Sequence, residues 1–566
     1  MLEKQREVLV DASQSVGRII FLPDTRQKFL FFIPKNHTPA LKLLKSSMWF
    51  EITNEKYGKI YRAATSLEAL FWLKDTLGQL SLSPEVNEWR KKISQSVSIK
   101  PIPHLPLFDF QREAIGFLLT HNRCMLSLSP GLGKTICSIT ATNLSTRIQR
   151  VLVVAPLSLL YMWKSEIIKW EPFLQRKSTI NIVHGKKITT EKEANEDNYI
   201  AWTITNPETA QKMADPPNRI DYDLLILDES ILYKSRNAKR TKGIRKLANK
   251  IPKVWELTGA PANRMIDDIW SQFHILNEKA YSSYHRFAQE YCMVNPTTWG
   301  NQVIANKLNA EEKIKQRFQD IYFARSQNEV LDIPDWIFEE IDIPMSKRQE
   351  KAYHELNLFL YTTLTNELDD GTIVDSTQVT VVNHLAKVVR LIQLASNPML
   401  LDGDNESGKW DALPELMEYY PGPWLIWTSF TRTAYHLQEQ LGPLVDNKIG
   451  LIIGDTKTQE RNQLIEEYQR GDKKILILNM QTGSFGHTLT AARTAFYPER
   501  NYDSNYFQSL HRFRRIGTTQ SPNVVHLRSV YQDGSPTIDH LIHSLLDYRV
   551  GMIQNLTTGM LRGILK

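Results

Sequence analysis

The chain has 566 residues, 42% of them hydrophobic and 23% charged, which is the composition of a globular protein with three or four domains. Its net charge of +7 permits a polyanionic partner without requiring one, and its three dispersed cysteines (Cys124, Cys137 and Cys292) exclude a disulfide framework or a zinc site. No apolar run approaches the ~18 residues of a membrane span and no signal-peptide pattern is present, so we expect a cytoplasmic protein without a membrane partner.

Residues 1–100 predict a small α+β domain. Two apolar strands flank a short polar turn, which predicts a hairpin, and a third strand and two segments of helical spacing follow. The predicted elements are Arg18–Pro23, Lys28–Pro34, Leu41–Lys45, Lys59–Ala63 and Ser66–Leu77. Ile99–Pro106 contains three prolines and predicts a linker to the next domain.

From Leu107 onward, short aliphatic runs alternate with helical or loop segments, which is typical of a parallel sheet with crossover helices. The alternation weakens after residue 265, where charged and aromatic residues indicate helices, and it returns after Gly408. The predicted strands are Arg123–Ser127, Arg150–Ala155, Thr179–His184, Ile200–Thr205, Leu224–Leu227, Trp424–Trp427, Ile449–Ile453, Ile475–Leu478 and Asn523–Leu527.

We therefore predict an α/β protein in four parts. Residues 1–100 form an accessory domain, and 101–335 form a first parallel-sheet lobe that is helical from about 265. Residues 336–407 form a helical insertion or linker, and 408–566 form a second parallel-sheet lobe.

The stretch SLSPGLGKTI, residues 127–136, breaks a short apolar run into a glycine-rich turn. Cradling a phosphate needs consecutive backbone N–H groups that point into one concavity, which glycines permit. Lys134 can then extend a cation to the β- and γ-phosphates, and the Thr135 hydroxyl can bind Mg²⁺. The full pattern has a glycine where this chain has Leu128, so the stretch is a relaxed P-loop. Its predicted nucleotide-binding residues are Pro130, Gly131, Leu132, Gly133, Lys134 and Thr135.

LLILDES, residues 224–230, is an apolar strand that ends in two carboxylates. Because it follows a P-loop, we predict that Asp228 holds Mg²⁺ and that Glu229 orients and deprotonates the attacking water. For an isolated acidic pair, the alternative interpretation would be a helix cap after a strand.

QSLHRFRRIG, residues 508–517, places Arg512 and Arg515 three positions apart, so that both could project from one helical face. Phosphoryl transfer gains from added positive charge at the γ-phosphate, which predicts arginine fingers. A solvated basic face is the alternative interpretation.

In their order along the chain, these stretches resemble the Swi/Snf-like family of superfamily-two helicase-type ATPases, from about Leu107 to Met552. Further segments carry the same resemblance. They are FDFQREAIGFL (108–118), VLVVAPLSLLYMWKSEIIKW (151–170, motif Ia), ITNPETA (204–210, motif Ib), LTGAPANR (257–264, motif III), DDIWSQFHIL (267–276), FARSQNEVLDIP (323–334), IPMSKRQEKAYHEL (343–356), WLIWTSFT (424–431, motif IV), ILNMQTGSFGHTLTAA (477–492, motif V) and SPTIDHLIHSLLDYR (535–549). LLILDES (224–230) resembles motif II of the family, and QSLHRFRRIG (508–517) resembles motif VI.

The resemblance implies two RecA-like lobes that use ATP and Mg²⁺. It implies that Gln111 reads adenine, that Gln508 belongs to the nucleotide site, and that Arg515 aligns with the last arginine of its motif. Three departures stand out. Ile231 replaces the histidine that usually couples nucleotide to motif III, Ser484 and His487 alter motif V, and His511 with Arg514 is expected to add charge near the nucleotide.

Contacts to nucleic acid are predicted from charge and from the resemblance. Residues 234–250, KSRNAKRTKGIRKLANK, hold eight basic residues and no acid, directly after motif II. A solvated helix face is the alternative interpretation. Backbone contacts are implied at motif Ia and motif V. The predicted nucleic-acid residues are Pro156, Ser158, Lys234, Arg240, Lys242, Lys246, Gly483, Ser484 and Gly486. Trp163, Trp170 and Trp270 are expected to be core residues.

These features predict a monomeric, ATP-driven translocase on double-stranded or branched DNA, in a compact bacterial or viral form. A strand-separating DNA or RNA helicase is the alternative within the enzyme class. A nucleotide-gated DNA-binding scaffold with poor hydrolysis is the alternative from another class, motivated by Ile231. Our hypothesis is that residues 1–100 confer a preference for DNA junctions. The alternative interpretations are a structural cap on the first lobe and a docking site for another protein.

Overall fold

The computed structural model describes residues 98–185, 187–189, 198–213, 221–262, 265–297, 300–359, 361–367, 373–380, 384–480, 488–500, 504–515 and 518–544, with strands and short helical pieces between 18 and 88. The chain divides into two compact units, residues 1–330 with 552–566, and residues 331–551. Among the described residues, no helix is both long and apolar enough to cross a membrane.

The N-terminal part contains a five-stranded sheet in the order β3-β4-β2-β1-β5. The predicted hairpin and third strand are confirmed, since β1 pairs antiparallel with β2, and β2 with β4. β3 and β5 were not predicted. The strands are β1 (Arg18–Leu22), β2 (Lys28–Pro34), β3 (Glu51–Asn54), β4 (Gly58–Ala64) and β5 (Ser81–Leu82). The predicted helix Leu41–Lys45 lies outside the described residues.

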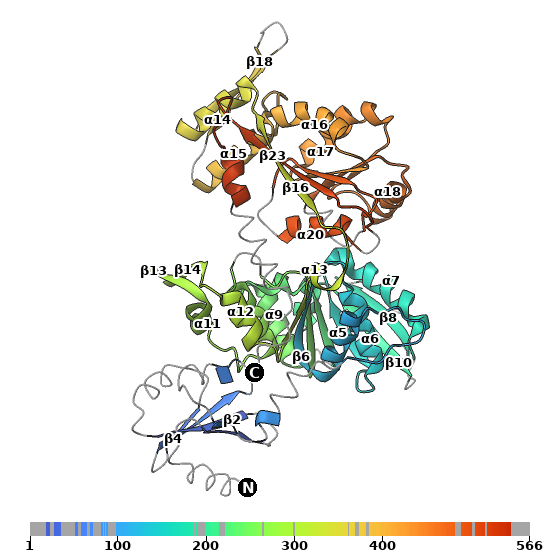
Figure 1. The fold of residues 1–566 in the computed structure, drawn as a ribbon, viewed down its shortest axis with the longest axis vertical. Helices are drawn as coiled ribbons and strands as arrows, with labels where there is room; N and C mark the ends of the chain where they lie inside the picture. The colour runs from blue at the N-terminus through green and yellow to red at the C-terminus, as the bar shows by residue number, and fades with distance from the viewer. Residues whose placement is uncertain are drawn as a thin grey trace. The chain divides into compact units, whose positions relative to one another are not determined.

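The first lobe is built on an eight-stranded sheet in the order β15-β6-β12-β11-β7-β10-β8-β9, parallel except for β9 (Figure 1). The five predicted strands of this lobe are confirmed, and β9, β12 and β15 are additional. The strands are β6 (Arg123–Leu128), β7 (Arg150–Val154), β8 (Lys177–His184), β9 (Lys187–Thr189), β10 (Tyr199–Thr205), β11 (Leu224–Asp228), β12 (Lys253–Thr258) and β15 (Tyr322–Arg325).

The central strands β6, β11 and β12 are buried along almost their whole length, as expected of parallel strands with helices on both faces. The helices are α5 (Asp109–Thr120), α6 (Lys134–Leu144), α7 (Leu160–Trp170), α8 (Pro207–Met213), α9 (Lys239–Ala248), α10 (Asp268–Leu276), α11 (Tyr284–Tyr291), α12 (Ala310–Arg317) and α13 (Gln327–Val330). Because β6, β12 and β11 are neighbours, the loops at their carboxyl ends emerge side by side, where α/β sheets bind ligands.

The region after residue 265 is less helical than predicted. Between α11 and α12 the chain forms an antiparallel hairpin of β13 (Cys292–Thr297) and β14 (Gly300–Asn306), with a bulge at Met293 and Val294 (Figure 1). Val294 and Thr297 in one arm, and Val303 and Ile304 in the other, favour strand over helix.

The second unit has a six-stranded, all-parallel sheet in the order β16-β23-β22-β19-β21-β20. The four strands predicted after Gly408 are confirmed. The strands are β16 (Ile337–Pro344), β19 (Trp424–Thr428), β20 (Ile449–Ile452), β21 (Ile475–Asn479), β22 (Thr494–Tyr497) and β23 (Asn523–Val530).

The prediction of a helical insertion at 336–407 is wrong at its start, because β16 is an edge strand of the second sheet. Its partner β23 supplies Arg528, which pairs with Glu340 and Asp342 of β16 and so stabilises a strand that carries acidic side chains. The rest holds α14 (Lys347–Phe359), a hairpin of β17 (Tyr361–Glu367) and β18 (Ile373–Thr380), and α15 (His384–Ser396).

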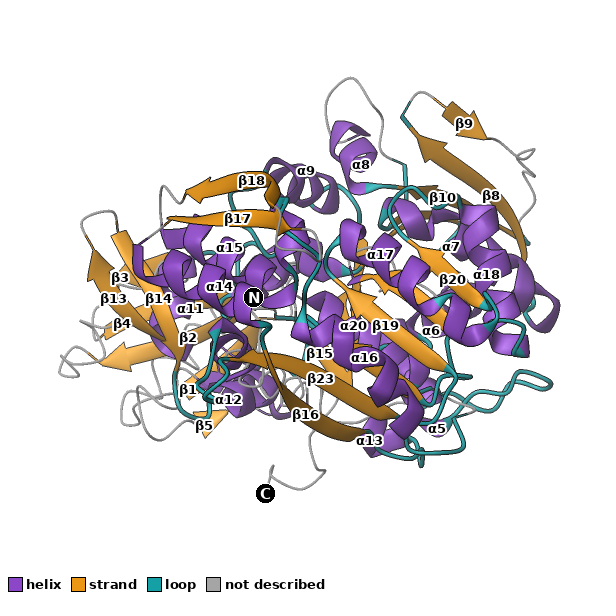
Figure 2. Cartoon of the chain, turned by 90° about the horizontal axis from the view of Figure 1, so that it is seen from above, coloured by secondary structure: helices purple, strands orange, loops and turns teal. Residues whose placement is uncertain are grey.

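Helices α16 (Gly408–Tyr419), α17 (Thr431–Leu441), α18 (Thr458–Arg470) and α20 (Ser504–Phe513) accompany this sheet, and Figure 2 shows them in purple beside the orange strands. One apolar cluster joins α16 and α17 to the strands through Trp410, Leu413, Leu437, Ile426 and Val525.

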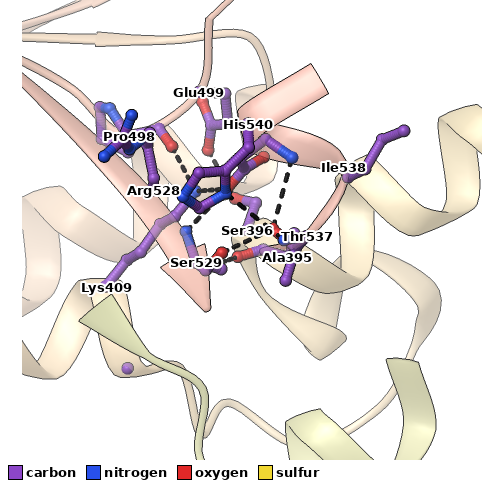
Figure 3. A network of polar contacts seen from close by, with 12 residues as sticks. Ala395, Ser396, Lys409, Pro498, Glu499, Arg528, Ser529, Thr537, Ile538 and His540 are labelled. Carbon is purple, nitrogen blue, oxygen red and sulfur yellow. Dashed lines mark hydrogen bonds and ion pairs between the residues drawn. The ribbon is translucent and has the colours of Figure 1, made fainter. Parts of the chain in front are cut away.

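A buried polar network fastens the chain after β23 to this lobe (Figure 3). Lys409 of α16 is 1% exposed, and its Nζ donates to Asp539 at 2.6 Å and to the Pro498 carbonyl at 2.7 Å. The Asp539 carboxylate also accepts from the backbone N–H of Ser529 at 2.9 Å. A buried ion pair is stable only when its remaining hydrogen-bonding groups are satisfied, and these bonds meet that need.

Candidate nucleotide site

The glycine-rich loop between β6 and α6 has the backbone shape that a phosphate cradle needs. Gly131 and Gly133 have φ of 87° and 85°, in the left-handed region that favours glycine. A Cβ on Gly133 would lie 2.5 Å from Nε2 of Gln111, so a side chain there is excluded by space as well as by conformation. The structure therefore gives both glycines the backbone role that the sequence predicted.

Gln111 lies in the first turn of α5 and braces this loop. Its Nε2 donates to the Leu132 carbonyl at 3.0 Å, and its Oε1 accepts from the Phe108 backbone N–H at 3.1 Å. The side chain is 5% exposed. The Gln111 side chain thus lies against the P-loop. That it reads adenine stays a prediction.

Lys134 begins α6, and its Nζ donates to the Leu128 carbonyl at 3.0 Å. The departure at Leu128 is accommodated because this residue ends β6 with its side chain fully buried, so the loop uses only its backbone. Thr135 follows as the second residue of the helix, half-buried. Its hydroxyl is one of the two predicted magnesium ligands.

Asp228, the other predicted magnesium ligand, is the last residue of β11 and is 5% exposed. One carboxylate oxygen accepts from the Trp163 indole N–H at 2.8 Å, and the other from the Glu229 backbone N–H at 3.0 Å. Burial raises the pKa of Asp228, while the Trp163 bond and the Lys134 charge act to lower it. β6, which leads into Lys134, and β11, which ends at Asp228, flank β12, so the P-loop and motif II lie at the same edge of the sheet.

Glu229 has φ of 50° and ψ of 56°, the left-handed region that residues with a side chain rarely adopt. Such strain persists only where the surroundings hold it, and it is concentrated at functional sites. Buried Asp228 precedes Glu229, and fully buried Ser230 follows it. The turn separates the predicted catalytic base from the strand that carries the predicted metal ligand.

Motif III completes the cluster at the end of β12. A Cβ on Gly259 would lie 3.0 Å from Cγ of Pro130 and 3.5 Å from Nζ of Lys134, so the backbone of Gly259 packs directly on the P-loop. From the other side of β6, Gln327 of α13 donates to the Pro130 carbonyl at 2.7 Å and is 2% exposed. The loops after β6, β11 and β12 thus converge on Lys134.

The donor chemistry of this cluster fits a magnesium nucleotide. Asp228 and Thr135 offer oxygen ligands, which Mg²⁺ prefers, and Lys134 offers a cation at the cradle formed by Gly131 and Gly133. At Gly133 and Gly259 a Cβ would meet Gln111 and Pro130, so only glycine allows the loop to pack this closely at both positions.

Motif VI lies in the second unit, and its two predicted fingers differ in setting. Arg512 is 6% exposed in α20, whereas Arg515 follows the end of that helix at Phe513, so one helical face does not carry both. Arg515 donates to the Thr488 hydroxyl at 2.7 Å and to the His511 carbonyl at 2.8 Å. Burial lowers the pKa of Arg515 to about 10. Gln508, one turn before Arg512, is buried.

The Arg514 charge is paired within the second unit, and the expectation that Arg514 and His511 add charge near the nucleotide stays a prediction. Arg514 donates from Nε to the Pro334 carbonyl at 2.7 Å, and from Nη2 to Asp335 at 2.7 Å. Its guanidinium also lies 4.3 Å from the centroid of the Trp336 ring. The side chain is 1% exposed and fastens motif VI to the segment that enters the second unit. The His511 ring packs against Phe507 and Trp336.

The basic segment after motif II forms an amphipathic helix, α9. Thr241, Ile244 and Leu247 are buried, while the predicted DNA contacts Arg240, Lys242 and Lys246 are exposed. Lys234 is half-buried, and in motif Ia Pro156 is half-buried and Ser158 exposed. The motif V residues Gly483, Ser484 and Gly486 lie outside the described residues. The nucleic-acid contacts stay predictions.

Sequence reasoning missed Trp163 and Gln327 as site residues. Trp163 is fully buried, which confirms the core expectation, but its indole also holds Asp228. A buried tryptophan needs an acceptor for its N–H, and that requirement was the available signal. No comparable signal marks Gln327.

Two sequence families match the chain. The SNF2-related domain matches residues 46–398, more than half of the chain, and the helicase conserved C-terminal domain matches residues 408–518. The first match begins well before Leu107, so part of the predicted accessory domain lies within it.

Three curated relatives are similar. The human DNA annealing helicase and endonuclease ZRANB3 is 26% identical over 78% of this chain and 39% of its own length. The SWI/SNF-related matrix-associated actin-dependent regulator of chromatin subfamily A-like protein 1 of Xenopus tropicalis is 22% identical over 74% of this chain and 42% of its own length. The putative ATP-dependent helicase/translocase YwqA of Bacillus subtilis (strain 168) is 23% identical over 83% of this chain and 51% of its own length.

The chain thus spans about half or less of the length of these relatives. The fold agrees with the sequence matches. The chain has two parallel-sheet lobes, and the loops after β6, β11 and β12 lie at one edge of the first sheet. This chain belongs to the SNF2-related family of helicase-type proteins.

Proposed function

We propose that the chain is a DNA-stimulated ATPase that uses ATP and Mg²⁺ to translocate along double-stranded or branched DNA. The observation that carries the proposal is the arrangement of Lys134 after β6 and of Asp228 and Glu229 at the end of β11, two strands that flank β12 in one parallel sheet. A second parallel-sheet lobe with an arginine-rich motif completes the set of groups that phosphoryl transfer uses.

Each side chain has a defined task in this mechanism. Lys134 and the loop N–H groups bind the β- and γ-phosphates, while Asp228 and the Thr135 hydroxyl would hold Mg²⁺, whose charge neutralises the phosphate oxygens when bound. Glu229 orients the attacking water and accepts its proton. Arg512 and Arg515 reach the γ-phosphate when the lobes close, and repeated closing and opening moves the protein along the polymer.

DNA is the proposed substrate because of the family and the exposed charge on α9. ZRANB3, one of the relatives, is by its name a DNA annealing helicase and endonuclease. Exposed arginine and lysine side chains supply the phosphate contacts that dominate non-specific DNA affinity. We further propose that residues 1–100 favour junctions over plain duplex.

ATP hydrolysis measured side by side with single-stranded DNA, duplex, forked DNA and RNA tests this function. Strong stimulation by duplex and forked DNA is the expected result. Stimulation by single strands or RNA alone would indicate a strand-separating helicase. Binding of ATP and DNA with negligible turnover on every polymer would indicate a nucleotide-gated scaffold.

A further inference from the structure

Ile231 stands where the resemblance implies a histidine that couples the nucleotide to motif III. In the structure Ile231 is 6% exposed and belongs to the apolar core. An aliphatic side chain cannot hydrogen-bond to another loop, so the link between motif II and motif III must run through other atoms. The neighbouring residue Ser230 provides them.

Ser230 forms a buried hydrogen bond with α10, the helix that follows motif III. Its hydroxyl donates to Oε1 of Gln272 at 2.7 Å. Both residues are 0% exposed, and Gln272 lies in the middle of α10. No water competes for such a bond, so its geometry is well determined.

The other end of the same amide holds motif III. Nε2 of Gln272 donates to the Pro261 carbonyl at 2.7 Å and to the Asp268 carbonyl of its own helix at 3.2 Å. A planar amide fixes its acceptor and its donors relative to one another. A displacement of the Pro261 backbone therefore acts directly on the position of Ser230.

Both ends of this connection reach groups at the nucleotide. Ser230 directly follows Glu229, whose backbone is held in the left-handed region. Pro261 is two residues from Gly259, which packs against Pro130 and Lys134. Motif II, Gln272, motif III and the P-loop are thus linked by a continuous series of contacts.

We infer that Gln272 is a positioning residue that couples motif III to the catalytic carboxylate Glu229 through Ser230. This inference rests on the proposed ATPase function and adds a route by which movement of motif III changes the rate of hydrolysis. Gln272 touches neither the reacting atoms nor the polymer, so it acts on the orientation of Glu229 and not on nucleotide affinity.

The test compares Ser230→Ala, Gln272→Leu and the double variant. Gln272→Leu leaves both the Ser230 hydroxyl and the Pro261 carbonyl without their partner, whereas the double variant removes the Ser230 hydroxyl as well and leaves only the Pro261 carbonyl without its donor. We expect the melting temperature to fall in each single variant and to be higher in the double variant than in Gln272→Leu.

Turnover distinguishes a positioning role from a structural one. In the stable double variant we expect kcat with DNA to stay about tenfold below that of the unmodified protein, with KM for ATP changed by less than about twofold. Recovery of kcat together with the melting temperature would overturn the inference, because the bond would then serve stability alone.

Gln349→Leu is the matched control. Gln349 is also 0% exposed and donates to a backbone carbonyl, that of Leu394 at 2.7 Å, but it belongs to the second unit and to neither motif II nor motif III. We expect it to lower stability and to leave kcat unchanged at a temperature where it is folded.

A binding measurement separates this inference from the proposed function. With a non-hydrolysable ATP analogue, amide hydrogen exchange at Ala260 and Ala262 should slow in the unmodified protein and much less in the double variant, although both bind the analogue. Equal slowing in both would overturn the coupling, whatever the turnover. Failure of the unmodified protein to bind the analogue would instead contradict the proposed function.

Discussion

The indole N–H of Trp163 donates to the carboxylate of Asp228 at 2.8 Å, and both side chains are buried. Trp163 comes from α7 and Asp228 from the end of β11, so the bond ties motif Ia to the predicted metal ligand. The same residue therefore packs the lobe and orients a functional carboxylate.

Trp163→Phe should keep most of the packing and remove only the donor. A hydrogen bond to a charged group contributes about 1.5–3 kcal/mol, so we expect turnover to fall by about tenfold or more, with a higher Mg²⁺ requirement. A magnesium titration of ATP hydrolysis measures both effects. Trp170→Phe is the control, because Trp170 of the same helix donates to Glu166, away from the site. Equal effects of the two variants would contradict the role of Trp163.

Lys134→Ala and Glu229→Gln should separate binding from chemistry. Lys134→Ala removes a phosphate-binding cation and should abolish turnover without unfolding the lobe. Glu229→Gln keeps the phosphate-binding groups and removes the base, so we expect it to bind ATP and hold it unhydrolysed. Filter binding with labelled ATP and a single-turnover assay measure the difference. Near-normal turnover of Glu229→Gln would refute the motif II assignment.

Arg515→Ala should lower turnover by about 10³-fold, with a much smaller change in ATP affinity. Arg512→Ala is expected to have the smaller effect, since Arg515 aligns with the last arginine of the family motif. Steady-state kinetics at saturating ATP test the ranking. Small, equal losses from both would show that neither arginine acts as a finger.

Replacing Arg240, Lys242 and Lys246 together by alanine should weaken DNA binding to a similar extent for all sequences. The slope of log affinity against log salt should become shallower by about one for each DNA phosphate that the variant no longer neutralises. Basal hydrolysis should persist, because these exposed side chains lie on the solvent face of α9. Fluorescence anisotropy across a salt series measures the slope, and unchanged affinity would place the DNA path elsewhere.

Two buried histidines should make the second unit sensitive to acid. Burial lowers the pKa of His526 and of His543, and the nearby Arg500 and Arg528 lower both further. The unfolded chain binds a proton on each histidine below about pH 6.5, and the folded chain does not. The free energy of unfolding should therefore fall as pH drops below that value, by up to about 1.4 kcal/mol per pH unit for each histidine.

His543→Gln should reduce this slope, as measured by denaturant unfolding between pH 7 and pH 5. Nδ1 of His543 lies 3.2 Å from Glu340, a contact that opposes the effect of burial. His540→Gln is the control, since His540 is partly exposed beside Asp342. An unchanged slope in His543→Gln would show that Glu340 keeps the histidine charged in the folded protein.

The sequence was sufficient to predict the strands and loops that are determined by the residue types within the segment itself. The buried run 224–228 and the glycines of the P-loop are set by residue type alone. β12 was missed because Glu256 interrupts its apolar pattern, although this residue is 0% exposed. β16 was missed because its acidic residues depend on Arg528, which is remote in the chain.

The contacts of the site that escaped prediction share one property. Trp163 with Asp228, Ser230 with Gln272, and Arg514 with the Pro334 carbonyl all join residues that are distant in sequence. Residue type says that each side chain needs a hydrogen-bond partner, but only the folded chain decides which partner it is.

The pairing of β16 with β23 bears on how the protein is made. Residues 337–344 leave the ribosome long before residues 523–530, so β16 stays without its partner strand until β23 has been translated. The sheet of the first lobe is complete at Arg325 and can fold while the remainder is translated. A message truncated before codon 523 would therefore yield a folded first lobe attached to an aggregation-prone second one.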